Sequence, residues 1–112
     1  MKIYKIMTHS DYKAFESLSE FIGSSVDLSD GYIHFSTDRQ LLETTKKHFY
    51  GKTNLHLVWA EHTKFGKDLV WEISRGGDEF PHLYRKWHFN EVEGDCLLPW
   101  EKTHHAFPPG HP

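Results

Sequence analysis

Polar and apolar residues alternate along several stretches of the chain, and this period of two is typical of β-strands. The alternation predicts a short extended piece at residues 80–84, one or two strands within 87–98, and longer strands at 2–7, 32–36, 55–61 and 69–74. Residues 55–61 are apolar on both sides, which favours a central strand.

Apolar residues at steps of three and four predict two main helices. The first is expected to follow the capping residue Ser10 and to end at Gly23, with residues 26–30 as a loop. The second covers residues 38–50 and ends at Gly51. Strands with only two clear helices indicate an α+β fold with a small, antiparallel-rich sheet.

Residues 30–37, Asp-Gly-Tyr-Ile-His-Phe-Ser-Thr, combine a turn, a strand and a helix start. Thr37 with Gln40 three residues later fits a capping box. In a strand over 32–36, Tyr32, His34 and Ser36 would share one face, and the apolar residues between them would face the core. The pattern therefore predicts a histidine and a hydroxyl side by side near a helix N-terminus.

The length and composition of the chain limit the classes of function that it can have. A chain of 112 residues suits one domain, expected over 1–98 and followed by an irregular tail rich in proline and histidine over 99–112. A net charge of −3 disfavours duplex nucleic acid as a partner. The single cysteine fits a reducing compartment. With no long apolar run at the start, we expect no signal peptide or membrane span, and a cytoplasmic protein. The oligomeric state is not predicted.

Glu72 stands in the middle of the apolar run Leu-Val-Trp-Glu-Ile, where burying a carboxylate without a partner is costly. The alternative is that Glu72 points to solvent from a half-exposed sheet face. His34 and Glu72 are the candidate catalytic residues. Ser36, Thr37 and the helix N-terminus supply donors suited to a phosphate or a ribose.

Residues 75–84 supply the remaining candidates for ligand binding. Arg75 can bind an anion through two hydrogen bonds, and the glycines after it permit a sharp turn. His82 follows a proline, and Tyr84 adds an aromatic face and a hydroxyl. The alternative is a hairpin loop followed by an edge strand.

Three ordered motifs carry a resemblance to a known family. They are residues 30–37 with Gln40, residues 71–77 (Trp-Glu-Ile-Ser-Arg-Gly-Gly) and residues 80–84 (Phe-Pro-His-Leu-Tyr). The chain resembles the domain-of-unknown-function family 952 up to about Gly94. That family is similar in fold to the ADP-ribosyltransferases.

The resemblance implies a split sheet with a cleft of the size of NAD. It implies that His34, with Ser36 or Thr37, holds the nicotinamide ribose, and that Glu72 serves the reaction. For the tyrosine of those enzymes, Tyr84 follows the glutamate, out of the usual order, and Tyr32 or Tyr50 are competing matches.

The expected function is therefore binding of NAD or a related small-molecule nucleotide, with ADP-ribosyl transfer or cleavage of the nicotinamide–ribose bond. Such cleavage passes through an oxocarbenium-like state, which a carboxylate stabilises. A binding module without catalysis would use the same residues. A metal-dependent hydrolase would use His34, His82, His88 and Glu72, but their spacing matches no metal motif, so no metal is predicted.

Overall fold

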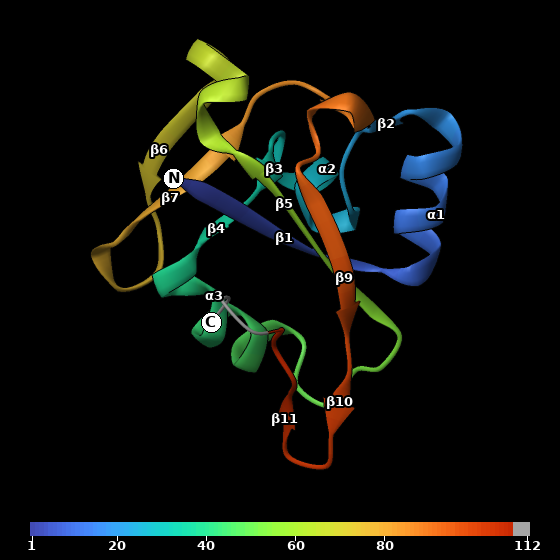
Figure 1. Cartoon of the computed structure of the whole chain (residues 1–112). Helices are drawn as coiled ribbons and strands as arrows, with labels where there is room; N and C mark the ends of the chain where they lie inside the picture. The colour runs from blue at the N-terminus through green and yellow to red at the C-terminus, as the bar shows by residue number, and fades with distance from the viewer. Residues whose placement is uncertain (109–112) are drawn as a thin grey trace.

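The computed structural model describes residues 1–108, and its architecture is α+β (Figure 1). The three α-helices are α1 (His9–Leu18), α2 (Ser25–Asp30) and α3 (Asp38–His48). Three 3₁₀ turns follow, η1 (His62–Asp68), η2 (Arg75–Gly77) and η3 (Phe89–Glu91). The strands are β1 (Lys2–Thr8), β2 (Glu20–Phe21), β3 (Ile33–His34), β4 (Ser36–Thr37), β5 (Leu55–Glu61), β6 (Leu69–Ile73), β7 (Glu79–Leu83), β8 (Trp87–His88), β9 (Gly94–Leu98), β10 (Trp100–Glu101) and β11 (His104–His105).

Two antiparallel sheets organise the molecule. The first has the order β4-β1-β5-β9, and β1 pairs with β5 over seven residues, from Lys2 opposite Glu61 to Thr8 opposite Leu55. The second has the order β3-β7-β6. Two short ribbons, β2-β8 and β10-β11, complete the strand pairing. The predicted antiparallel α+β fold and the central position of residues 55–61 are confirmed.

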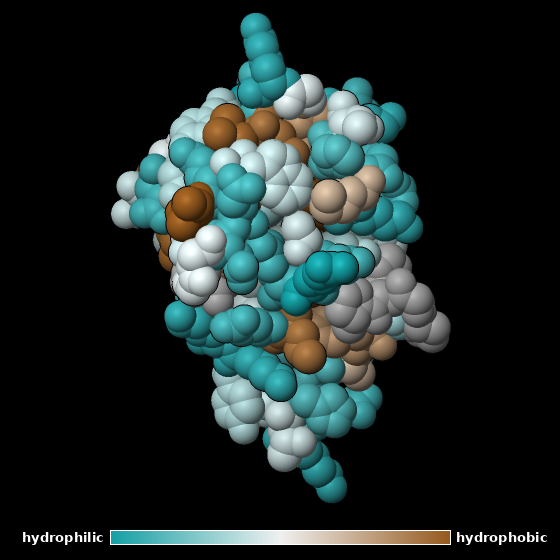
Figure 2. Space-filling view, turned by 90° about the vertical axis from the view of Figure 1, so that its left-hand side faces the viewer, coloured by the Kyte–Doolittle hydropathy of each residue, from teal (hydrophilic) through white to brown (hydrophobic). Residues whose placement is uncertain are grey.

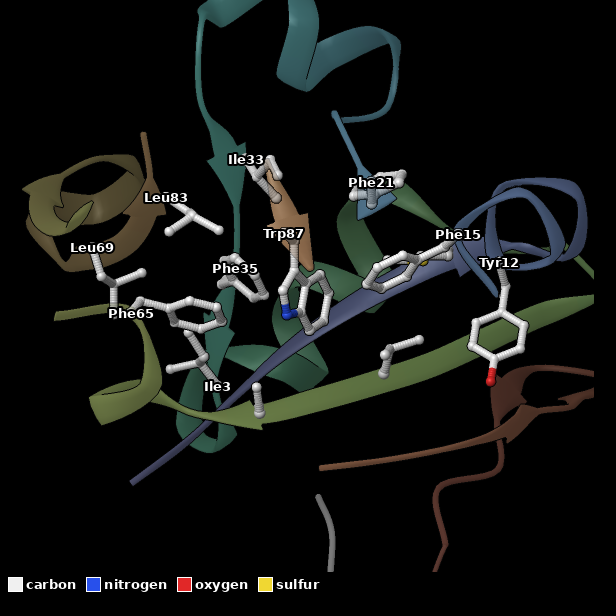
Figure 3. Packing of buried hydrophobic residues seen from close by; sticks show 13 residues of the cluster. Ile3, Tyr12, Phe15, Phe21, Ile33, Phe35, Phe65, Leu69, Leu83 and Trp87 are labelled. Atoms are coloured by element: carbon white, nitrogen blue, oxygen red, sulfur yellow. The ribbon is translucent and has the colours of Figure 1, made fainter. Parts of the chain in front are cut away.

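The core lies on both sides of the four-stranded sheet. Between that sheet and the three-stranded sheet, the fully buried Trp87 packs against Phe15 and Phe35, with ring centroids 5.0 and 4.9 Å apart (Figure 3). On the opposite face, α3 contributes Leu41 to a second cluster that includes Leu57. Burial on both faces explains why β5 carries apolar residues on both of its sides.

The strand predicted at 32–36 is in fact divided between the two sheets. β3 pairs with β7, whereas β4 pairs with β1, and Phe35 lies between them. The backbone N–H of Phe35 donates to the carbonyl of Pro81 at 3.0 Å, while the Phe35 side chain enters the core. A single alternating stretch therefore supplies strands to two sheets, which alternation alone does not reveal.

Two further expectations from the first third of the chain are wrong. α1 begins at His9, is capped by Thr8 rather than Ser10, and ends at Leu18 rather than near residue 22. The segment expected as a loop is α2, which Ser24 and Asp27 start with a capping box. A helix of six residues is too short to show a clear helical period.

The tail is not irregular up to residue 105. β10 and β11 form a hairpin, and the buried His105 donates from Nε2 to the carbonyl of Lys52 at 2.9 Å. Residues 109–112, which include His111, lie outside the described part of the chain. None of the helices in residues 1–108 is long and apolar enough to span a membrane.

Candidate functional site

The outer face of the three-stranded sheet gathers polar and aromatic side chains. His34 on β3 lies opposite His82 on β7, and His82 in turn lies opposite Val70 on β6. Two residues further along β6, Glu72 is on the same face. The adjacent residues Ile33, Leu69 and Leu83, which alternation points to the other side of the sheet, are buried in the core. The sheet thus brings His34 and Glu72 to one face, with His82 between them.

Glu72 is held by two hydrogen bonds. Its Oε1 accepts from Nδ1 of His82 at 2.8 Å and from the Tyr84 hydroxyl at 2.6 Å. The side chain of His82 is 4% exposed and that of Glu72 is 39% exposed. Glu72 is therefore half-buried and has partners. Its position lies between the two alternatives from the sequence, a buried carboxylate with a partner and a carboxylate that points to solvent. We call His34, Glu72, His82, Tyr32 and Tyr84 the polar face.

These contacts change the acidity of the polar face. Hydrogen bonds from Tyr84 and His82 lower the pKa of Glu72. The bond to Glu72 raises the pKa of Tyr84 to about 12. Burial lowers the pKa of His82, although Glu72 opposes that effect. At neutral pH the face therefore presents an ionised carboxylate beside a protonated phenol.

Tyr32 joins the two histidines. Its ring stacks on His82, with centroids 4.1 Å apart and an interplanar angle of 29°. It lies 4.7 Å from the His34 ring and 5.2 Å from the Tyr84 ring. Tyr32 and Tyr84 thus both belong to the polar face, whereas Tyr50 packs on Trp100 beside the β10-β11 hairpin.

Both ring nitrogens of His34 face carboxylates. Nδ1 lies 2.7 Å from Oδ1 of Asp27, and Nε2 lies 3.0 Å from Oδ2 of Asp30. Oδ1 of Asp27 also accepts the backbone N–H of His34 at 3.1 Å. Asp27 is buried, whereas Asp30 ends α2 at the surface.

Lys5 approaches the same histidine from the core. Its Nζ lies 3.0 Å from Oδ2 of Asp27 and donates to the carbonyl of His34 at 2.8 Å. Burial lowers the pKa of Lys5, and Asp27 opposes this effect. Burial raises the pKa of Asp27, but the hydrogen bond from His34 and the charge of Lys5 outweigh it and lower that pKa.

Sequence reasoning missed Lys5 and Asp27. The signal for Lys5 is its place on β1, because alternation puts it on the same side as Ile3 and Met7, which are both in the core. A charged residue on an apolar face of a strand needs a buried partner. The sequence gives a weaker signal for Asp27, because its place in the capping box of α2 already accounts for an acidic residue there.

Two predicted ligand-binding residues, Ser36 and Thr37, lie away from the polar face. Ser36 is buried and its hydroxyl is 3.1 Å from that of Thr44 on α3, so the expectation that it shares a face with His34 is wrong. The division of the strand at Phe35 is the reason. Thr37 caps α3, and the predicted capping box with Gln40 is confirmed. Arg75 lies in η2, and its side chain is outside the described part of the structure.

The surface has two hollows of about 230 Å³ each, of which only the second is lined by residues of the polar face. The first is lined by Thr37, Gln40, Gly76, Asp78 and Phe80, at the start of α3. The second is lined by Ile22, Leu28, Tyr32, Tyr84 and Arg85, beside α2. Sites for small molecules usually have about 300–1,000 Å³, so neither hollow alone has the size of a dinucleotide.

The side of the molecule that carries β6 and β7 is mainly hydrophilic (Figure 2). Hydrophobic residues form only small, separate patches on the view in that figure. Within residues 1–108, no group of three or more histidine, cysteine or acidic side chains is arranged to hold a metal ion. His88, one of the candidate ligands, lies in the separate β2-β8 ribbon.

Comparison with known proteins identifies the family. Solved structures of CC0527 from Caulobacter crescentus match the chain. The crystal structure has 42% identity, covers 94% of this chain and 92% of that chain, and has a TM-score of 0.90. The solution NMR structure also has 42% identity, covers 93% and 90%, and has a TM-score of 0.84.

No protein of curated function matches. The matching structures support the fold and do not extend to an ADP-ribosyltransferase. The model of the family described as "Protein of unknown function (DUF952)" matches residues 6–94. The chain therefore belongs to the DUF952 family of proteins of unknown function.

Proposed function

We propose that the polar face binds a ribose-containing nucleotide, and that NAD is the ligand to test first. The observation that carries the proposal is the placement of His34 and Glu72, 38 residues apart in the sequence, on one face of the three-stranded sheet with His82 between them. The choice of NAD as this ligand rests on the resemblance of the motifs to ADP-ribosyltransferase-like proteins. Two antiparallel sheets around one core also agree with the split sheet that this resemblance implies.

The chemistry of Glu72 suits a ribose. An ionised carboxylate accepts hydrogen bonds from hydroxyl groups and stabilises positive charge that develops on a sugar ring. The lowered pKa of Glu72 keeps it ionised at neutral pH. In this proposal Glu72 binds a ribose hydroxyl and, if turnover occurs, stabilises the oxocarbenium-like state formed as nicotinamide leaves.

The aromatic rings and the hollow beside α2 suit the other parts of a nucleotide. Tyr32 and Tyr84 line that hollow, and its 230 Å³ fits one planar ring or one ribose rather than a whole dinucleotide. The remainder of NAD would extend over the polar face, where it would stay partly exposed to solvent.

A binding module without catalysis is the second candidate. One observation favours it: Oε1 of Glu72 already accepts two hydrogen bonds, from His82 and Tyr84. A carboxylate oxygen with two donors is well fixed for recognition, and it must give up a partner to approach a reacting carbon.

Two measurements on one set of proteins test the proposal. Thermal unfolding with and without NAD reports binding, since a ligand of the folded state raises the midpoint. Chromatography of released nicotinamide reports turnover. We expect stabilisation by NAD in the wild type, loss of it in Glu72→Gln and His34→Ala, and no change in Glu101→Gln, which alters an exposed glutamate of the β10-β11 hairpin.

Stabilisation by NAD without released nicotinamide selects the binding module. Absence of any shift with NAD and its fragments contradicts the nucleotide proposal. An equal shift in Glu72→Gln and the wild type removes Glu72 from the site.

A further inference from the structure

We propose that Lys5 and Asp27 act as positioning residues that fix the His34 side chain for its ligand. The part of this proposal that concerns the ligand rests on the proposed function. The part that concerns the orientation of His34 does not.

The two residues together hold three atoms of His34. Asp27 accepts hydrogen bonds from the ring Nδ1 and from the backbone N–H, at 2.7 and 3.1 Å, through the same Oδ1. Lys5 donates to the carbonyl oxygen of His34 at 2.8 Å. One ion pair therefore sets both the backbone position and the ring orientation of one residue.

The cost of this ion pair argues for a role beyond stability. The side chains of Lys5 and Asp27 are only 9% and 2% exposed, and Lys5 comes from the core side of β1, among apolar neighbours. Taking two charges out of water is expensive, and apolar replacements of a buried ion pair are often neutral or stabilising. The pair is thus a costly way to fill the core, whereas it is an effective way to orient an imidazole.

The resemblance implies that His34 binds a ribose, and the geometry indicates which ring nitrogen would bind it. With Nδ1 directed at Asp27, Nε2 is the nitrogen that points toward the surface, where Asp30 lies 3.0 Å away. Asp30 is 45% exposed at the end of α2, so a ligand can replace it. A hydroxyl group both donates and accepts, and it fits Nε2 in either protonation state. A ribose hydroxyl, the group that the resemblance implies for His34, therefore fits Nε2.

The test compares two double variants. Lys5→Met/Asp27→Leu removes both charges and every acceptor for Nδ1 of His34. Lys5→Met/Asp27→Asn removes the charges but keeps an amide oxygen that accepts from His34. Replacing both partners together avoids a buried unpaired charge, which would unfold the protein for a trivial reason. Lys2→Met, at the exposed start of β1, is the matched control.

The first readout is the ¹⁵N NMR spectrum of the His34 imidazole, assigned by its loss in His34→Ala. In the wild type and in Lys2→Met we expect hydrogen on Nδ1, protected from solvent exchange. In Lys5→Met/Asp27→Leu we expect that protection to be lost, and in Lys5→Met/Asp27→Asn we expect most of it to return. Amide spectra of each variant verify that it is folded.

The second readout is NAD affinity, expected to fall by about tenfold or more in Lys5→Met/Asp27→Leu and to recover in Lys5→Met/Asp27→Asn. An unchanged Nδ1 signal in folded Lys5→Met/Asp27→Leu overturns the positioning role, whatever NAD does. Should NAD not bind the wild type, the proposed function fails, while the NMR readout still decides the orientation of His34.

Discussion

At the scale of single residues, the polar face is a chain of hydrogen bonds and ring contacts. Tyr84 and His82 both donate to Glu72, and Tyr32 stacks on His82. The buried Asp27 pairs with Nδ1 of His34. Alternation predicted which face of its strand His34 and Glu72 each occupy, whereas the pairing of β3 and β6 with β7 brings both residues to one face. Alternation also places Lys5 on an apolar face of β1, but it does not identify the partner Asp27, which lies 22 residues away.

The hydrogen bond between Tyr84 and Glu72 predicts how the Tyr84 hydroxyl titrates in alkaline solution. Since Glu72 raises the pKa of Tyr84 from 10.0 to about 12, Glu72→Gln should return the titration of Tyr84 toward 10. Ultraviolet absorbance of tyrosinate, measured as the difference between wild type and variant, checks this. Tyr84→Phe identifies which part of the curve belongs to Tyr84. Identical curves for the wild type and Glu72→Gln would contradict the hydrogen bond.

The lowered pKa of Asp27 predicts how the stability of the protein changes in acid. Its pKa is lower in the folded protein than its ordinary value of 3.8, so the folded state binds fewer protons than the unfolded state. The stability that Asp27 contributes is fully present above that ordinary value and is lost as the pH falls below it. We expect a shallower loss of stability below about pH 4 in Lys5→Met/Asp27→Asn than in the wild type.

Urea unfolding at a series of pH values checks this acid prediction. Asp78→Asn, which alters an exposed aspartate in the loop before β7, should leave the wild-type slope unchanged. Equal slopes in the wild type and Lys5→Met/Asp27→Asn would contradict the lowered pKa of Asp27.

At the scale of elements, short segments decide the site. β3 and β4 have two residues each and belong to different sheets, so Ser36 is taken away from His34 and placed against α3. Longer elements such as β1 and α3 were predictable from their periods, because many residues repeat the same pattern. α2 was not, because six residues give less than two full turns.

The start of α3 gives a prediction at this scale. Thr37 accepts from the backbone N–H of Gln40, and the Gln40 side chain accepts from the backbone N–H of Thr37. Thr37→Ala removes the cap and should lower the free energy of unfolding by about 1 kcal/mol. Thr37→Ser keeps a hydroxyl and should lose much less. Chemical denaturation measures both, and equal losses would contradict the capping role.

At the scale of the whole molecule, two sheets share one core, and Trp87 occupies its centre (Figure 3). Fold class was predictable from the count and order of the elements. The division into two sheets depends on the course of the chain at Phe35, a tertiary contact with Pro81 that no local pattern encodes.

The central position of Trp87 predicts a large effect on stability. Trp87→Ala leaves a cavity between both sheets and should cost about 3–5 kcal/mol in the free energy of unfolding. Trp100→Ala, in the partly exposed β10-β11 hairpin, is the matched control and should cost less. Denaturant unfolding compares the two, and a greater loss in Trp100→Ala would contradict the assignment of the main core.

The most direct measurement of the central claim is an NMR titration of the ¹⁵N-labelled protein with NAD, followed residue by residue. The account predicts that the largest amide shifts fall in residues 32–34, 70–72 and 82–84, the segments that carry the polar face, and that they disappear in His34→Ala. Shifts concentrated on another surface, or no shifts at millimolar NAD, would contradict it.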